Sequence, residues 1–286
     1  MVPSSIEVVP TSPNIGADII GVDLSQDVDD ATIAAIESAW HAHLILRIRD
    51  QHLTPGQLSA FSRRFGELEL APTGGEGTFW VEGHQDVLVL SNVVEDGKLI
   101  GALGNHEAQW HTDMSYNDVP PLGSHLYAVE VPETGGNTGF LNMYMAYETL
   151  PDETKARLDG MNLKHDAGHD SAGNLRKGRD PVSDLTTSLG AIHPIVRTHP
   201  AAGRKALFLG RRLNGYICGL PLAESEELLD FLWAHCDQER FTWHQEWRVG
   251  DLIMWDNRCA MHRRDAFSAD ARRIMHRTQV AGDKPY

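Results

Sequence analysis

Residues 250–258 read GDLIMWDNR, which predicts a turn, a buried strand and a polar corner. Similar short apolar runs recur along the chain, and Gly, Pro and Asn clusters divide many of them. The strand-like runs are LILRI at 44, VLVLS at 87, SHLYAVEV at 124, IHPIVRT at 192, KALFLG at 205, FTWHQEW at 241, LIMW at 252 and RRIMHRTQV at 272. This pattern predicts an antiparallel barrel or double-sheet jelly roll, mainly β, with helical additions.

Four helices are expected between these runs, each after an acidic, threonine or proline start. They run from Asp29 through Trp40, from Thr54 to Gly66, from Pro151 to Gly160 and from about Ala223 to Cys236. Residues 72–86 and 166–190 are rich in Gly, Asp, Ser and Thr without clear periodicity, so loops are expected there. With 286 residues and no internal repeat, one domain over residues 1–286 is expected.

The balance of charge excludes some partners. Lys and Arg total 25 against 40 for Asp and Glu, which gives a formal net charge of −15. Such a field repels a phosphate backbone, so nucleic acid is not an expected partner. The same field repels small anionic substrates, and an anion site must therefore be built from locally placed arginines.

The cysteines and the apolar runs predict the compartment. Cys218, Cys236 and Cys259 are an odd number without a C-x-x-C pair, which favours a reduced cytoplasmic protein. The start MVPSSIEVVP does not resemble a signal peptide, and no run approaches the roughly 18 apolar residues of a membrane span. The sequence predicts a cytoplasmic protein without a membrane partner.

A candidate metal site lies in the segment Trp110-His111-Thr112-Asp113. On an extended chain the two side chains at 111 and 113 point to the same face, so both can bind one ion. Alone, His-x-Asp is a weak signal, since a single histidine is more often structural. Two histidines and one carboxylate on one side of an iron form the facial triad of non-haem Fe(II) oxygenases, which leaves three positions open. The segment therefore needs a third ligand elsewhere in the chain.

Two arginines in the last strand-like run indicate an acid-binding interior. In a strand, Arg273, Met275, Arg277 and Gln279 share one face, and four residues span about 13 Å at roughly 3.3 Å each. A charged outer face is the alternative, but Met275 and Gln279 do not make a fully charged stripe. Because buried arginines without anionic partners are costly, an inward face implies a bound acid.

Several long motifs occur together. They are GADIIGVDLS near the start, FGEL at 65, WHTDMSY at 110, GGNTGF at 135, HPIVRTHPAAGRKALFLGR at 193, AESEELLDFLWAH at 223, WDNR at 255, RRIMHR at 272 and GDKP near the end. In these motifs and their order the chain resembles the taurine dioxygenase and 2,4-dichlorophenoxyacetate dioxygenase (TauD/TfdA) family of 2-oxoglutarate-dependent enzymes. The resemblance covers nearly the whole chain and implies a double-stranded β-helix, or jelly roll.

The resemblance also implies roles for particular residues. His111, Asp113 and His262 match the iron ligands of the family, so Fe(II) is the implied metal. Thr138 and Arg273 match residues that hold the distal carboxylate of 2-oxoglutarate, which with dioxygen is the implied co-substrate. A bidentate guanidinium fork suits a carboxylate, and a threonine hydroxyl adds a further hydrogen bond.

Arg277 matches a second arginine, beside the metal-bound carboxylate of 2-oxoglutarate and the acidic group of the substrate. Two positions depart from the taurine enzymes. Ala71 stands where those enzymes carry a histidine that helps read the sulfonate, and Glu107 replaces an asparagine. A substrate larger or more apolar than taurine is therefore expected.

Other polar residues in the shared motifs are expected to be structural. His193, His199 and His276 have nothing that brings them beside iron. The Trp-Asp-Asn run at 255–257 is expected to order the strand end that carries the distal ligand.

The implied activity is hydroxylation of a small anionic compound, a carboxylate, sulfonate or sulfate ester, with release of succinate and carbon dioxide. The product fragments if the attacked carbon bears nitrogen, oxygen or a sulfonate. The alternatives are a taurine dioxygenase proper, a zinc hydrolase with the same ligands, or a non-catalytic jelly roll that binds a small acid. The sequence leaves open the substrate, the attacked carbon and the oligomeric state, a homo-oligomer included.

Overall fold

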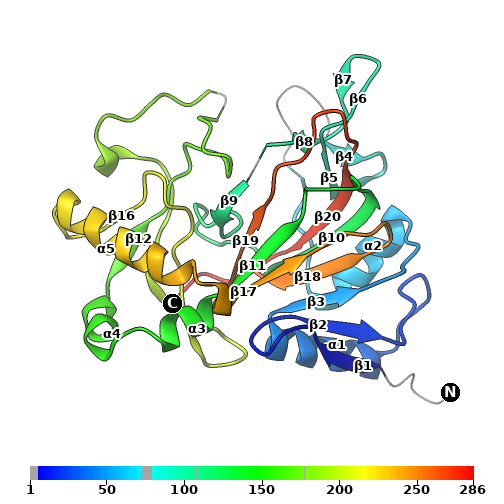
Figure 1. Ribbon diagram of the computed structural model, residues 1–286, viewed down its shortest axis with the longest axis horizontal. Coiled ribbons are helices and arrows are strands. Elements are labelled where there is room, and N and C mark those ends of the chain that lie inside the picture. The colour runs from blue at the N-terminus through cyan, green and yellow to red at the C-terminus, as the bar shows by residue number, and fades with distance from the viewer. Residues whose placement is uncertain (1–5, 72–78, 107, 177) are drawn as a thin grey trace.

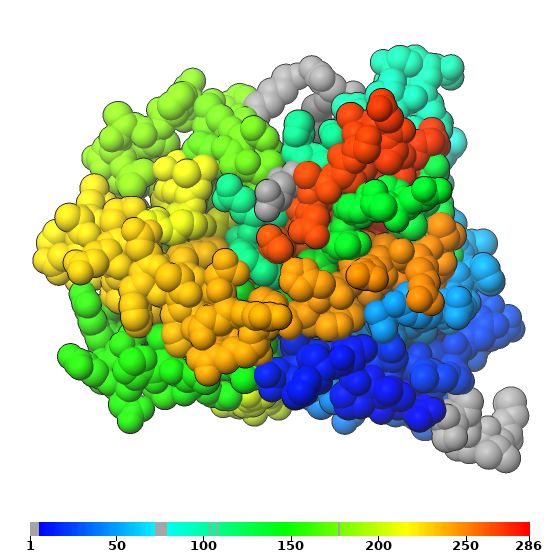
Figure 2. Space-filling model, in the orientation of Figure 1, coloured from blue at the N-terminus to red at the C-terminus, as the bar shows by residue number. Residues whose placement is uncertain are grey.

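The computed structural model describes residues 6–71, 79–106, 108–176 and 178–286 (Figure 1). One large sheet contains β1 (Glu7–Pro10), β2 (Ala17–Ile20), β3 (Ile45–Ile48), β4 (Trp80–Val81), β5 (His84–Ser91), β8 (Ala102–Leu103), β10 (Gly123–Glu130), β18 (Leu252–Asp256) and β20 (Ile274–Val280). Its order is β1-β2-β3-β18-β10-β20-β5-β4, with β8 beside β5. Strands from the two ends of the chain are therefore neighbours, and Figure 2 shows the orange segment seated against the blue one.

A second sheet faces the first. It contains β9 (Ala108–His111), β11 (Thr138–Asn142), β17 (Thr242–Gln245) and β19 (Ala260–Arg264), in the order β17-β11-β19-β9. Among the described strands, the pairs of this sheet are antiparallel, and in the large sheet only the β2–β3 and β5–β8 pairs are parallel. Together the two sheets confirm the predicted jelly roll.

Short strands and helices complete the fold. The short strands are β6 (Val94–Glu95), β7 (Lys98–Leu99), β12 (Asn162–Lys164), β13 (Ile192–Pro194), β14 (Val196–Thr198), β15 (Lys205–Leu207) and β16 (Tyr216–Ile217). The α-helices are α1 (Asp30–His43), α2 (Pro55–Ser62), α3 (Met143–Glu148), α4 (Asp152–Leu158) and α5 (Leu222–Cys236). Single 3₁₀ turns lie at Arg63–Phe65, Leu185–Thr187 and Glu239–Phe241. None of the helices in the described ranges is long and apolar enough to cross a membrane.

The first two helices begin at the capping residues that the sequence indicated. The Asp29 side chain accepts a hydrogen bond from the backbone N of Thr32, and Thr54 forms a reciprocal capping box with Gln57. Both helices pack on the outer face of the large sheet (Figure 1). That sheet is therefore covered by helices on one side and by the second sheet on the other.

Strand β18 shows why an uninterrupted apolar run forms here. Leu252 and Met254 pack in the cluster that contains α1 and α2, whereas Ile253 and Trp255 pack in the cluster that contains the second sheet. Because successive strand side chains point to opposite faces, both sets are buried only if both faces are covered. The apolar run at 252–255 thus forms the centre of the fold.

Some expectations were wrong in detail. Part of the loop expected at 72–86 forms β4 and the start of β5, because Trp80 pairs with Leu88 and Val81 with His84; residues 72–78 lie outside the described ranges. The single run expected at 192–198 divides into β13 and β14 around the buried Ile195. Helix α3 was not predicted, since its six residues are too few to show a period.

Candidate metal centre

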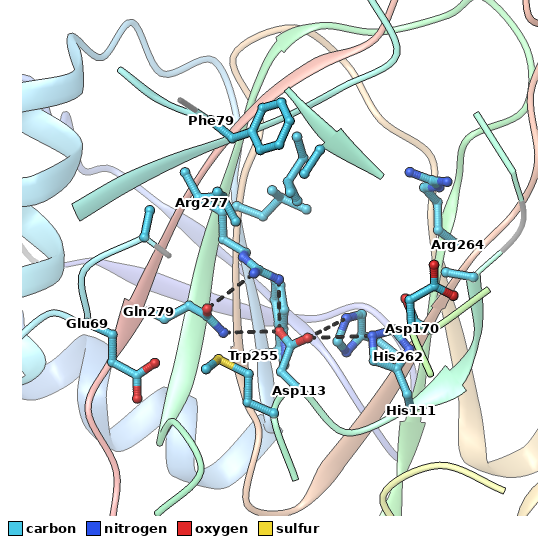
Figure 3. Close-up of a pocket in the computed structure, with 18 of the residues that line it drawn as sticks. Glu69, Phe79, His111, Asp113, Asp170, Trp255, His262, Arg264, Arg277 and Gln279 are labelled. Carbon is cyan, nitrogen blue, oxygen red and sulfur yellow. Dashed lines mark hydrogen bonds and ion pairs between the residues drawn. The ribbon is translucent and has the colours of Figure 1, made fainter. Parts of the chain in front are cut away.

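Two neighbouring strands bring three metal-binding side chains together. His111 ends β9, Asp113 follows it, and His262 lies opposite His111 in the adjacent strand β19. The Oδ1 atom of Asp113 is 3.5 Å from Nε2 of His111 and 3.9 Å from Nε2 of His262. All three residues are buried, and Figure 3 shows them pointing toward one another in a cavity. Nearly 150 residues of sequence separate the third ligand from the first two. The pairing of β9 with β19 brings them together in space.

The protonation states suit a divalent metal. Nδ1 of His111 is 2.7 Å from the backbone O of Gln109, which can only accept, so Nδ1 carries a proton and Nε2 is the nitrogen that can bind a metal. Burial and the neighbouring His111 lower the pKa of His262 well below 6.5, and its ring is therefore neutral. Burial raises the pKa of Asp113, but the nearby Arg277 and imidazoles outweigh it and hold that pKa well below 3.8. Two imidazoles and one carboxylate thus converge within 4.8 Å, and these donors fit iron(II).

The second oxygen of Asp113 is held away from the two imidazoles. Arg277 donates to Oδ2 from Nη1 at 3.1 Å, and Gln279 donates to it from Nε2 at 3.3 Å. The hydroxyl of Ser124 donates to the same oxygen at 3.4 Å. These contacts orient the carboxylate, so that Oδ1 faces His111 and His262 (Figure 3).

Asn257 holds the backbone of Asp113. Its Oδ1 accepts from the backbone N of Asp113 at 2.8 Å, and its Nδ2 donates to the backbone O of the same residue at 3.0 Å. Trp255 packs against the His262 ring with 4.7 Å between ring centroids. The 255–257 run was expected to order the strand end that carries the distal ligand; Trp255 does contact His262, and Asn257 in addition holds Asp113.

A guanidinium that forms no ion pair with any described residue lies in the same cavity. Arg273 is 3 % exposed, and its Nε has no hydrogen-bond partner among the described residues. Burial, together with Arg264, lowers the pKa of Arg273 from 12.5 to about 9. Thr138 also lines the cavity, and its hydroxyl accepts from Nε1 of Trp247 at 3.0 Å. A buried cation in this state indicates a binding site for an anion.

The cavity has a volume of about 270 Å³, a size suited to small molecules. All six residues that the sequence singled out line it: His111, Asp113, Thr138, His262, Arg273 and Arg277. Ala71 is on the wall too, whereas Glu107 lies outside the described residues.

Sequence reasoning missed several lining residues. Arg264, Arg176 and Arg211 add positive charge to the cavity, and Glu69 and Asp170 add carboxylates. Burial raises the pKa of Glu69. Arg211 was only the last residue of the long motif at 193, and no motif contained the other four, which come from separate loops or strand ends.

A second cluster contains residue types that can bind a metal: His41, His199 and Asp256. Hydrogen bonds and ion pairs within the protein engage this cluster instead. Nε2 of His199 is 2.9 Å from Oδ2 of Asp256, and Arg258 donates to both oxygens of that carboxylate. Nδ1 of His199 accepts from the backbone N of Ala202. Both ring nitrogens of His199 and both carboxylate oxygens of Asp256 are therefore engaged in hydrogen bonds. Neither His199 nor the other two motif histidines lines the cavity of the triad.

Comparisons with known proteins agree with this geometry. Residues 7–279 match the model of the family described as "Taurine catabolism dioxygenase TauD, TfdA family". The chain is 33% identical over 292 residues to the (S)-phenoxypropionate/alpha-ketoglutarate-dioxygenase of Sphingobium herbicidovorans, with 98% of this chain and 96% of that protein covered.

Solved structures give the same result. A taurine dioxygenase from Burkholderia xenovorans has a TM-score of 0.81 at 33% identity, with 98% of this chain and 91% of that chain covered. The structure of AAD-2 in complex with Mn(II) and N-oxalylglycine has a TM-score of 0.79 at 28% identity, with 98% and 99% covered. The similarity extends over nearly the whole length of each of these proteins.

Proposed function

This chain belongs to the taurine catabolism dioxygenase TauD, TfdA family, and on that premise we propose that His111, Asp113 and His262 bind its iron. The enzyme is an oxidoreductase, an Fe(II)- and 2-oxoglutarate-dependent dioxygenase. The observation that supports the assignment is the convergence of two imidazole nitrogens and one carboxylate oxygen in a buried cavity. A zinc hydrolase and a non-catalytic binding module have no counterpart among the similar proteins named above.

For the co-substrate, we propose that Arg273 and Thr138 bind the distal carboxylate of 2-oxoglutarate. The support is the buried Arg273 guanidinium, which has no carboxylate partner among the described residues. A bound dicarboxylate would compensate this charge, and the Thr138 hydroxyl would add a hydrogen bond. Arg277 remains a predicted contact to 2-oxoglutarate and to the substrate, beside its contact with Asp113.

In the mechanism, the residues of the protein position the metal ligands. Bound iron and 2-oxoglutarate supply dioxygen activation, in which 2-oxoglutarate and dioxygen yield succinate and carbon dioxide and one oxygen atom enters the substrate. Gln109 keeps the His111 proton on Nδ1, and Arg277 and Gln279 keep Oδ1 of Asp113 toward the imidazoles. These contacts orient the donor atoms of His111 and Asp113 before the metal binds, and Trp255 packs against the ring of His262, so little reorganisation is needed.

For the substrate, we propose a small organic anion with an apolar body. Ala71, Phe79, Leu88 and Leu90 make part of the cavity wall apolar, and an aryl or alkyl group fits such a wall. A relative named for (S)-phenoxypropionate supports an acid of this kind. Taurine itself, named in a similar solved structure, stays the alternative.

We also propose that residues 1–286 form one domain, that the partner is a small molecule rather than nucleic acid or membrane, and that the protein is cytoplasmic. One continuous core joins both sheets to α5, which supports the single domain. Three unpaired cysteines and the negative net charge support the other two proposals. A homo-oligomer is the state to test by light scattering.

Turnover tests the proposed function. We expect succinate release from 2-oxoglutarate to require Fe(II) and dioxygen, and a substrate to increase it. Asp113→Ala should lose most of this activity, because one of three protein ligands is gone. Asp118→Ala removes an exposed carboxylate five residues on and serves as the control. Full activity of the Asp113 variant would refute the assignment.

A further inference from the structure

Two further arginines form a cationic wall in the cavity. Arg176 and Arg211 line it together with the metal triad. Their guanidinium carbons lie 4.3 and 5.3 Å from the centroid of the Tyr116 ring. Both donate to the backbone O of His169 at 3.0 Å, Arg176 from Nε and Arg211 from Nη1. One ring and one carbonyl therefore fix both guanidiniums.

Neither guanidinium forms an ion pair with a described residue. Within the described ranges, no carboxylate oxygen lies within the 4.0 Å of an ion pair from Arg176 or Arg211. Asp170 shares the cavity wall, but its oxygens accept hydrogen bonds from the backbone N of Ala172 and from both nitrogens of Asn174. Burial and the neighbouring Arg176 lower the pKa of Arg211, and they outweigh the opposing effects of Tyr116, Asp113 and Asp170. In a protein of net charge −15, two such cations side by side attract an anion.

The backbone ties these arginines to the metal strand. The backbone O of Gly210 accepts from the N of Thr112, the residue between the first two ligands, at 3.0 Å. Gly210 has φ +64°, and a Cβ there would lie 2.0 Å from Nδ1 of His165, so only glycine fits. On the other side, Gln109 donates its backbone N to the O of Ser171 at 2.9 Å, in the loop that leads to Arg176.

Arg277 is less available for a substrate. Its Nη1 donates to Asp113 and its Nη2 to Gln279, so part of its fork is engaged in holding a metal ligand. We propose that Arg176 and Arg211, stacked on Tyr116, bind the anionic group of the primary substrate. This inference rests on the proposed function, and the group is a carboxylate, sulfonate or sulfate ester. Two guanidinium groups can each donate paired hydrogen bonds to the oxygens of a planar carboxylate or a tetrahedral sulfonate or sulfate.

Calorimetric titration of the Mn(II)-loaded protein, saturated with 2-oxoglutarate, tests this assignment. The probes are 2-phenoxypropionate, hexyl sulfate and hexanesulfonate, with 2-phenoxypropionamide as the neutral counterpart. We expect Arg211→Gln and Arg176→Gln each to raise the Kd of the best-bound anion by about tenfold to hundredfold. The Kd of the neutral amide, and the Kd of 2-oxoglutarate titrated separately into the Mn(II)-loaded protein, should change less than about twofold. Arg211→Lys should recover part of the loss, since it keeps the charge without the fork.

Arg212→Gln is the matched control. Arg212 follows Arg211 directly, but it pairs with Glu226 and Asp230 on α5 and does not line the cavity. Its removal should leave all Kd values within about twofold, because exposed ion pairs contribute little.

The outcomes are distinguishable. An unchanged anion Kd in the Arg176→Gln, Arg211→Gln double variant overturns the inference. So does equal weakening of anion, amide and 2-oxoglutarate, which would indicate a purely structural role. Wild-type protein that binds Mn(II) and 2-oxoglutarate but none of the anions overturns the inference and leaves the proposed function intact. Wild-type protein that binds neither Mn(II) nor 2-oxoglutarate refutes the proposed function itself.

Discussion

Replacing Arg273 by Met should stabilise the ligand-free protein and weaken its binding of 2-oxoglutarate. The Arg273 charge is buried beside Arg264 with no carboxylate partner in the described part of the chain, and its pKa falls from 12.5 to about 9. At about 1.36 kcal/mol per pH unit, this corresponds to at most about 5 kcal/mol of unfavourable charge burial. Methionine keeps most of the volume without the charge, so we expect the free energy of unfolding to rise by about 1–4 kcal/mol. The distal carboxylate of 2-oxoglutarate then loses its partner, and its Kd should rise about a hundredfold.

Both effects are measurable on one preparation. Urea unfolding of the metal-free protein gives the stability, and calorimetry of the Mn(II)-loaded protein gives the Kd of 2-oxoglutarate. Arg272→Met is the control, because this exposed neighbour pairs with Glu95 and Glu130 outside the cavity. An Arg273→Met protein with unchanged 2-oxoglutarate affinity would refute the assigned role. A clear loss of stability without ligand would show that Arg273 has an internal partner.

Three other predictions concern the ligand loop, the acid stability and the substrate. Asn257→Ala leaves the backbone of Asp113 without its side-chain clamp, and the affinity for Mn(II) should fall about tenfold to hundredfold by titration. Burial lowers the pKa of His125 from 6.5 to about 3. The unfolded chain therefore takes up this proton first as the pH falls, and stability should drop between about pH 6.5 and 3, by up to about 2 kcal/mol at pH 5. Urea unfolding of His125→Gln at pH 7 and pH 5 should show a smaller acid loss than wild type, and an equal loss would contradict the assignment. In a substrate panel, 2-phenoxypropionate should stimulate succinate release more than taurine, and the reverse order would contradict the proposed apolar pocket.

Local signals predicted the elements that have a period or a cap. The capping residues Asp29 and Thr54 gave two helix starts, and the run at 252–255 gave the central strand. The pattern failed where tertiary contacts decide. The strand pair at 80–88 depends on a hairpin in a stretch that is rich in polar and glycine residues, and α3 depends on burial of Met143 and Tyr144 against the core. No window of sequence contains those partners.

The candidate site divides in the same way. His-x-Asp spacing predicted that His111 and Asp113 share a face, and period 2 predicted that Arg277 and Gln279 do. Residues that act through long-range contacts were not predictable, because nothing local marks them. Arg211 was visible only as the last letter of a long motif. Its approach to the cavity depends on the contact of Gly210 with Thr112.

The central claim is that three residues bind one iron, and metal binding tests it most directly. Anaerobic equilibrium dialysis with Fe(II), followed by metal analysis, should give one ion per chain for the wild type. His111→Ala and His262→Ala should each lose tight binding together with 2-oxoglutarate turnover, whereas His276→Ala, which changes a motif histidine outside the cavity, should retain both. One tightly bound iron per chain with full turnover in either triad variant would contradict the account.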